Sequence, residues 1–207
     1  IDDIVDIIDQ ENTEDFQKMA AMQPSQESYL KTKVTELAKR RIFWLLILMI
    51  SATFTGNIIK KYQDILSSVV ILSSFIPMLM DTGGNSGAQS STLIIRGLAL
   101  EEITTKDFFK VLLKELRVGM LVGGILSTVN FARIYFLEKA SLQVSFTVCL
   151  TIFFTTILAK LLGGSLPLLA KKLNKDPAIM AGPLITTIVD ALALMVYFAL
   201  ATRFLGI

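Results

Sequence analysis

The sequence predicts an all-α integral membrane protein in which five transmembrane helices follow a cytoplasmic segment of amphipathic helices. Three observations support this fold class. First, 53% of the 207 residues are hydrophobic, and the mean hydropathy is +0.61. Second, the first 41 positions are polar and charged, whereas long apolar runs make up most of the rest. Third, basic residues flank these runs, as they do at membrane edges. We therefore divide the chain into a cytoplasmic segment, residues 1–40, and a transmembrane domain, residues 41–207.

The cytoplasmic segment is predicted to form two amphipathic helices. Apolar residues recur at helical spacing near the start of the chain, which indicates a helix over 1–22. Pro24 interrupts this pattern, and a second helix over roughly 26–40 leads into the basic cluster Lys39-Arg40-Arg41. The start of the chain is acidic and lacks Met, so we expect no signal peptide and a natural protein that begins further upstream.

Five apolar segments in the rest of the chain are predicted to span the membrane. Each is close to the ~20 residues that cross a bilayer core, and each must be helical because lipid offers no partner for backbone polar groups. The second segment extends through a glycine-rich patch towards residue 100. The segments cover roughly residues 42–59, 64–81, 117–137, 141–163 and 177–201.

The distribution of Lys and Arg predicts the orientation. With the N-terminus in the cytoplasm, 13 basic residues lie on the inner side and 5 on the outer side, as the positive-inside rule requires. The C-terminus is then outside. An odd number of spans leaves no internal two-fold repeat, so we expect a pore or cavity to arise from symmetric pairing of two chains.

Several kinds of chemistry are excluded by composition. The sequence has no histidine and one cysteine, Cys149, which lies within an apolar run. Imidazole metal sites, thiolate metal sites and a Ser-His-Asp arrangement are therefore absent. We expect neither an enzyme nor a nucleic-acid-binding protein.

A polar patch from Asp81 to Thr92 (DTGGNSGAQSST) directly follows the apolar start of the second span. It could be a water-exposed loop at a helix end. It could also be a helix facing a polar cavity, with Asn85 and Gln89 supplying oxygen atoms. Apolar residues resume at 93–95, which favours a helix that continues through the patch.

Asp190 lies near the middle of the fifth span, where an ionisable residue is paired or functional by default. It could be protonated, or bonded to a Ser or Thr of a neighbouring helix. Thr186 lies four residues earlier on the same helix face, and Gly182 with Pro183 loosens the helix start and frees backbone carbonyl groups. Carboxylate, hydroxyl and carbonyl oxygens are the ligands of a hard cation such as Mg²⁺ or Ca²⁺. Two copies of Asp190, facing each other in a dimer, would match one divalent ion.

The acidic N-terminal segment has two interpretations. A solvated helix face is one. The other is a sensor of divalent cations, since a cation relieves the repulsion among packed carboxylates. Its members are Asp2, Asp3, Asp6, Asp9, Glu11, Glu14 and Asp15.

These motifs resemble the membrane part of the MgtE family of magnesium channels. The likeness covers essentially the whole chain and is carried by TGGNSGAQSSTLIIR at 82–96, Asp176-Pro-Ala before the fifth span, and PLITTIVD at 183–190. The N-terminal segment looks like the end of that family's second CBS domain leading into its connecting helix.

The resemblance implies a homodimer in the cell membrane, with five spans per chain and a pore on the two-fold axis. A largely hydrated Mg²⁺ would lie between the paired Asp190 carboxylates. The predicted ion site comprises Asp190, Thr186, Gly182, Gly83, Gly84 and Asn85. Gly182 stands where some relatives carry Asn, so no side-chain ligand is expected there. A bacterial inner membrane is the expected location.

The resemblance also implies that cytosolic Mg²⁺ closes the pore by binding acidic residues near the connecting helix. By position these are Asp3, Asp6, Glu11, Glu14, Asp15 and Asp176. Most of the family's cytosolic domains lie outside this sequence, so we expect each regulatory site to be incomplete here.

Two other functions compete with a Mg²⁺ channel. An ion-coupled secondary transporter of divalent cations would need Asp190 for the same reasons. An intramembrane aspartyl protease would use Asp81 and Asp190 as a dyad, but neither residue lies in a Gly-x-Gly-Asp signature.

Overall fold

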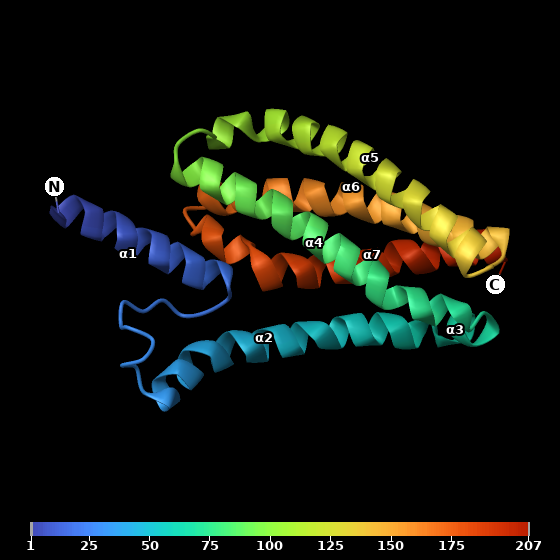
Figure 1. Cartoon of the computed structure of the whole chain (residues 1–207), viewed down its shortest axis with the longest axis horizontal. Helices are drawn as coiled ribbons and strands as arrows, with labels where there is room; N and C mark the ends of the chain where they lie inside the picture. Colours follow the sequence, from blue (N-terminus) through green and yellow to red (C-terminus); the bar gives the residue numbers. More distant parts are fainter. Residues whose placement is uncertain (1, 207) are drawn as a thin grey trace.

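The computed structural model describes residues 2–206, with side chains from residue 6 onward. Throughout this part of the chain the regular structure is helical and no strand occurs, which confirms the all-α prediction. The long helices run side by side, and the two ends of the chain lie at opposite ends of the bundle (Figure 1). The elements are α1 Asp2–Met19, α2 Val34–Lys61, α3 Gln63–Ser68, α4 Ile71–Ala99, α5 Phe108–Ala132, α6 Leu142–Lys172 and α7 Gly182–Leu205, with short turns at Thr105–Asp107 (η1), Arg133–Leu137 (η2) and Pro177–Met180 (η3).

Four helical stretches are long and apolar enough to cross a membrane. They correspond to the first, third, fourth and fifth predicted spans and make this a multi-pass membrane protein. The second predicted span is split into α3 and α4, with the break at Val69 and Val70. Helix α4 has 29 residues, about 43 Å at 1.5 Å per residue, but its polar patch keeps it out of the apolar group. The stretches are Val34–Lys61, Thr105–Leu137, Leu142–Lys172 and Pro177–Leu205.

The predicted amphipathic helix over 26–40 is wrong in its first part. Residues 22–33 contain no helix, and α2 begins only at Val34 and runs without a break past residue 40. The side chain of Gln17 explains the difference. Its amide nitrogen donates to the Ser25 carbonyl (3.0 Å), and its amide oxygen accepts from the Ser25 backbone N–H (2.5 Å). These bonds hold the chain after Pro24 in a non-helical path.

Helix α6 packs against α4, α5 and α7, and α4 packs against both α6 and α7. Small residues permit this close approach, which is how helices associate when lipid removes the hydrophobic drive between them. A Cβ atom on Gly163 of α6 would meet the backbone oxygen of Gly87 and lie 2.9 Å from Cβ of Ser90. A Cβ atom on Gly83 would lie 2.9 Å from Val189 of α7.

The main apolar core lies at the end of the bundle where α3 is and where α7 ends. Tyr197 and Leu72 are fully buried there, and the Tyr197 hydroxyl donates to the Leu72 carbonyl across 2.9 Å. Tyr62, just after α2, stacks on Phe198 with ring centroids 4.6 Å apart. This core joins the starts of α3 and α4 to the end of α7 and leaves the middle of α4 free of large side chains.

Substituting Gly163 tests the close contact between α4 and α6. Because an added methyl group would meet the α4 backbone, we expect Gly163→Ala to destabilise the bundle on the order of 1–3 kcal/mol, the usual cost of overpacking. Thermal unfolding of the detergent-solubilised protein measures it. Gly124→Ala is the matched control, because nothing lies within 4 Å of the added atom. Equal thermal stability of the two variants would contradict the packing described here.

Candidate ion site between α4 and α7

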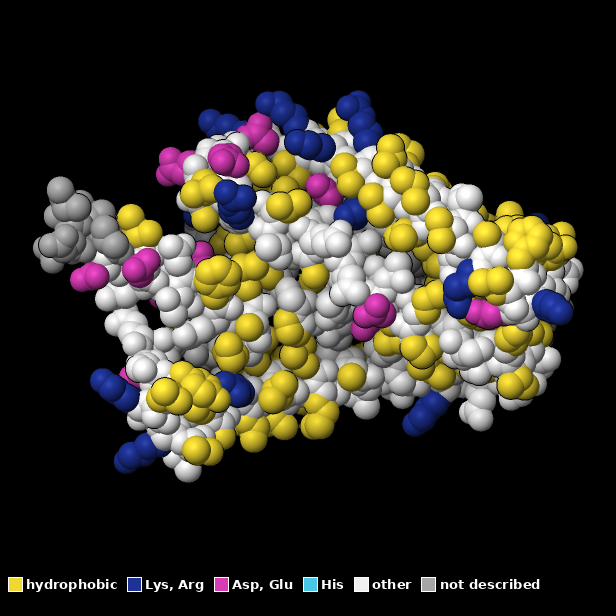
Figure 2. Space-filling view, in the orientation of Figure 1, with side chains coloured by type: hydrophobic (Ala, Val, Ile, Leu, Met, Phe, Trp, Pro, Cys, Tyr) yellow, Lys and Arg dark blue, Asp and Glu magenta, His cyan; other side chains and the backbone are white. Residues whose placement is uncertain are grey.

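An exposed polar stripe runs along α4. Its members are spaced by four, four and three residues, so they share one helix face, and all have exposed side chains: Asp81, Asn85, Gln89 and Thr92. Asn85, Gln89 and Thr92 line a surface cleft of about 690 Å³. The face over the middle of α4 carries few charged groups, whereas the Lys and Arg side chains lie mostly toward the edges and ends of the molecule (Figure 2). The prediction of a helix that continues through the polar patch is confirmed.

Asp190 of α7 lies beside this stripe. A Cβ atom on Gly84 would lie 3.1 Å from Cγ2 of Thr186 and 3.7 Å from Oδ1 of Asp190. The missing side chain of Gly84 therefore lets Thr186 approach α4 closely, with Asp190 one helix turn further on. The negative charges of Asp81 and Asp190 repel each other, so the two carboxylates lie near each other. The Thr186 hydroxyl donates to the Pro183 carbonyl (3.0 Å), so its oxygen keeps lone pairs for another partner.

Two of the six predicted ion-site residues lie elsewhere. Gly83 faces the interior, where an added Cβ atom would lie 2.7 Å from Cγ2 of Thr155. Gly182 lies at the start of α7, about 12 Å along the helix from Asp190 at 1.5 Å per residue. Its backbone has φ +47°, and an added Cβ atom would meet the Met19 carbonyl oxygen at the end of α1. The structure thus gathers Asp190, Thr186, Gly84 and the neighbouring Asn85.

The C-terminal end of α1 packs against the same two helices, at the end of the bundle where α4 ends and α7 begins. Met19 packs with Ile95 of α4 and with Ala178 and Ala181, which precede α7. Lys18 carries the electrostatic part of this contact. Its ammonium group donates to Asp176 Oδ2 across 2.5 Å and also contacts Glu14 one turn earlier.

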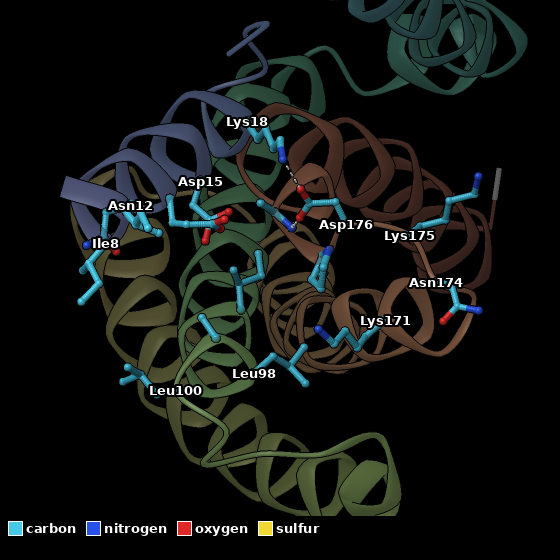
Figure 3. A pocket seen from close by; sticks show the side chains of 16 residues that line it. Ile8, Asn12, Asp15, Lys18, Leu98, Leu100, Lys171, Asn174, Lys175 and Asp176 are labelled. Carbon is cyan, nitrogen blue, oxygen red and sulfur yellow. Dashed lines mark hydrogen bonds and ion pairs between the residues drawn. The ribbon is translucent and has the colours of Figure 1, made fainter. Parts of the chain in front are cut away.

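A cavity of about 830 Å³ opens beside this contact, between α1, the end of α4 and the loop before α7 (Figure 3). Asp15 points toward it and Lys18 reaches across to Asp176 (Figure 3). The charged lining is mixed rather than acidic, because three lysines accompany the three carboxylates. These are Glu11, Asp15 and Asp176 with Lys18, Lys171 and Lys175.

This arrangement shifts the pKa values of Asp15 and Lys18. Partial burial, followed by the negative charge of Asp176, raises the pKa of Asp15 above its usual value despite the opposing charge of Lys18. Partial burial alone would lower the pKa of Lys18, but its hydrogen bonds to Asp176 and Glu14 outweigh this and raise it. Asp15 is thus a carboxylate short of positive charge, and Lys18 is an ammonium group held by two carboxylates.

The predicted regulatory residues are only partly brought together. Glu11, Asp15 and Asp176 share the cavity, and Glu14 joins them through Lys18. Asp6 is exposed outside the cavity lining, and the side chain of Asp3 lies outside the described residues. Within the described part of the chain, no group of three or more His, Cys, Asp or Glu side chains is arranged to hold a metal ion.

Sequence reasoning missed two charged residues of these sites. Lys18 was not assigned a role, because a lysine on an acidic amphipathic helix gives no signal of a partner 158 positions away. The predicted third span begins only at residue 117 and so leaves out Glu115, whereas α5 begins at Phe108 and carries Glu115 buried against α4. Lys114 and Arg117 flank Glu115 in the sequence, so its neighbours gave no signal that it is buried.

Comparison with known proteins identifies the family. Residues 76–200 match the model of the family described as MgtE, divalent cation transporter. The chain belongs to the MgtE family. It is also 36% and 35% identical to the proteins named magnesium transporter MgtE of Bacillus subtilis and Thermus thermophilus, over 99% and 97% of its length, and 29% identical to that of Enterococcus faecalis.

The MgtE match bears on the alternative of an intramembrane aspartyl protease. A family of divalent cation transporters is not a family of enzymes, so the match counts against the protease dyad of Asp81 and Asp190. The chain spans less than half of the length of these relatives, 44–45%. The matched region of 76–200 begins within α4 and ends within α7, and it contains the whole candidate ion site.

Substituting Lys18 tests the docking of α1. Lys18→Met leaves Asp176 and Glu14 without their shared counter-charge, so the end of α1 is held less firmly. We expect protease cleavage within residues 20–33 to become roughly threefold faster without divalent cations, as the loss of a partly exposed ion pair of at most ~1 kcal/mol predicts. Lys31→Met is the control, because Lys31 is exposed and forms no ion pair among the described residues. Equal cleavage of both variants would rule out the Lys18 contact.

Proposed function

We propose that this chain forms the pore of a Mg²⁺-selective channel that mediates magnesium uptake. One observation carries the proposal: Asp190 and the exposed polar stripe of α4 meet on one face of a bundle that is otherwise apolar and of membrane length. Lipid cannot cover such a face without a large free-energy cost. Water and a hydrated cation can.

The chemistry of the face supports Mg²⁺ as the substrate. Asp190, Thr186 and Asn85 offer carboxylate, hydroxyl and amide oxygens, which are ligands for hard cations. One chain supplies few direct ligands, and Mg²⁺ keeps several of its waters more readily than Ca²⁺ does. The relatives named magnesium transporters support the same ion.

A homodimer completes the site. One Asp190 per chain provides a single charge, and two copies around a two-fold axis provide the two charges that balance a divalent ion. An isologous interface along α4 would also cover the polar stripe, because each copy presents the same face to the other. The pore then lies on the axis, between two copies of α4 and α7.

In this assembly α4 is the second of five membrane spans. Its length and its packing against both α6 and α7 support this, since a helix covered by neighbouring protein need not be apolar on every side. The N-terminus is then cytoplasmic and the C-terminus outside. Residues 41–207 form the pore domain, and residues 1–40 form the end of a CBS domain with its connecting helix. A bacterial inner membrane is the proposed location.

Cytosolic Mg²⁺ is proposed to regulate the pore at the α1 contact. Glu11, Asp15 and Asp176 line one cavity, and Glu14 is joined to them through Lys18. Asp3 and Asp6 extend the acidic run toward the start of α1. A divalent ion there would compete with Lys18 for Asp176. The high pKa of Asp15 supports this, because an uncompensated carboxylate gains most from a bound cation.

The first prediction concerns the ion site. Asp190→Ala removes the only charge that α7 offers at mid-membrane, so we expect at least tenfold lower Mg²⁺ flux in proteoliposomes or loss of selectivity for Mg²⁺ over Ca²⁺. Asp64→Asn, which alters an exposed carboxylate of α3, is the control. Unchanged flux and selectivity in Asp190→Ala would refute the site. Single-channel currents separate a channel from an ion-coupled secondary transporter, since carriers turn over too slowly to give them.

The second prediction concerns regulation. In the full-length protein, we expect Mg²⁺ to protect residues 20–33 from proteolysis, because the ion would hold α1 against the loop before α7. Asp176→Asn should abolish most of this protection, while Asp107→Asn, at the far side of the loop after α4, should leave it intact. Protection that is absent in the unaltered protein would sink the regulatory assignment.

A further inference from the structure

Glu115 is a buried carboxyl group that the proposed ion path does not use. It lies on α5, well inside the bundle, and is only 9% exposed. Its Oε2 atom accepts a hydrogen bond from the Ser90 hydroxyl of α4 across 2.5 Å. Among the described residues, Ser90 is its hydrogen-bonding partner and no ion pair reaches it. Ionisable residues at such positions are rare and have a specific role.

Helix α6 is shaped to let this bond form. Gly164 leaves room for Glu115, because a Cβ atom there would lie 2.9 Å from the Glu115 Cγ atom. Gly163 leaves room for Ser90 in the same way. Three helices therefore meet at one polar junction. Lys160, 4% exposed and one turn before Gly164, brings a positive charge to the same side of α6.

Ser90 and the polar stripe lie on opposite sides of α4. Successive residues are separated by about 100° around the helix, so Ser90 is turned about 140° from the mean direction of the stripe. Burial agrees with this, since Ser90 is 1% exposed whereas the adjacent Gln89 is exposed. A rotation of α4 by one residue would take Ser90 away from Glu115 and turn the stripe into the protein.

We propose that Glu115 is a positioning residue that fixes the rotation of α4 about its own axis and thereby holds the polar stripe toward the pore. The small residues of α4 let it pack closely against α6 and α7, and the Ser90–Glu115 hydrogen bond adds a rotational preference to that packing. A hydrogen bond in a water-free interface supplies that preference, since a rotated α4 would leave a buried carboxyl group without a partner. This inference rests on the proposed pore face of α4.

Four variants of the full-length protein test the inference in proteoliposomes. Glu115→Leu keeps much of the volume and removes the acceptor, whereas Glu115→Gln keeps an acceptor oxygen. Ser90→Ala removes the donor. Lys114→Met removes a charge from the exposed neighbouring position and is the matched control. Folded protein is quantified by size-exclusion chromatography, so that flux is compared per folded molecule.

We expect Mg²⁺ flux per folded molecule to fall roughly tenfold in Glu115→Leu and in Ser90→Ala, as the loss of a bond to a buried ionisable group predicts. Glu115→Gln should retain most of the flux, and Lys114→Met all of it. The double variant Ser90→Ala with Glu115→Leu should be no worse than Glu115→Leu alone, because both changes remove one bond.

Labelling of α4 measures its rotation directly. Cysteine is introduced at Gln89, which is exposed, or at Ser86, which is buried, and is reacted with a water-soluble maleimide. The native Cys149 is buried and gives a low background. Glu115→Leu should lower the ratio of labelling at 89 to labelling at 86 several-fold. A merely structural role would lower the yield of folded protein and leave the ratio unchanged.

Each outcome decides the inference. Normal flux and a normal labelling ratio in Glu115→Leu overturn it, and if that variant does not fold, the same result in Ser90→Ala does. Asp190→Ala is assayed in parallel. If its flux is normal, the proposed pore fails, and the labelling ratio still reports whether Glu115 sets the rotation of α4. If its flux is lost while the Glu115 variants are normal, only the inference fails.

Discussion

In hydrocarbon, two helices gain little from burying apolar side chains against each other, so α4 depends on close backbone contact with α6 and α7. Gly87 meets Gly163 with no side chain between them, and Gly84 brings α4 against Thr186 of α7. This contact also divides the polar side chains of α4 into two groups. Ser90 and Ser91 are enclosed, whereas the stripe from Asp81 to Thr92 is left without cover. Helix α4 is thus packed against the bundle on one side, and its polar side chains are uncovered on the other.

Asp190 lies beside that uncovered face, where a carboxylate in contact with lipid has a large free-energy cost. Within one chain it is half-buried, has no ion pair among the described residues and is repelled by Asp81. Such a group is unfavourable in a monomer surrounded by lipid. Pairing two chains along α4 would bring four carboxylates near one axis, which raises the repulsion further unless a cation is present. The same charges that destabilise an empty assembly would then concentrate divalent cations in it.

Sequence patterns were sufficient for features that depend on one segment alone. Long apolar runs predicted four of the helices, and a lone carboxylate in such a run drew attention to Asp190. Features that depend on contacts between segments were beyond reach. Gly182 was grouped with Asp190 by proximity in sequence, but its positive φ serves the contact with Met19. The helix expected from residue 26 was prevented by Gln17, and the charges around Glu115 concealed the true start of α5.

The docking of α1 links the N-terminal part of the chain to both helices of the candidate ion site. Met19 touches Ile95 of α4 and the residues before α7, so a shift of α1 acts on two rigid helices at once. Lys18 holds this contact with one charge and is always present at the site, because it belongs to the same chain. A divalent ion carries two charges and could bridge several of the surrounding carboxylates, but it must be taken from solution. Under the proposed regulation the lysine therefore sets the concentration of Mg²⁺ at which the ion replaces it, and a stronger Lys18–Asp176 pair would shift that threshold upward.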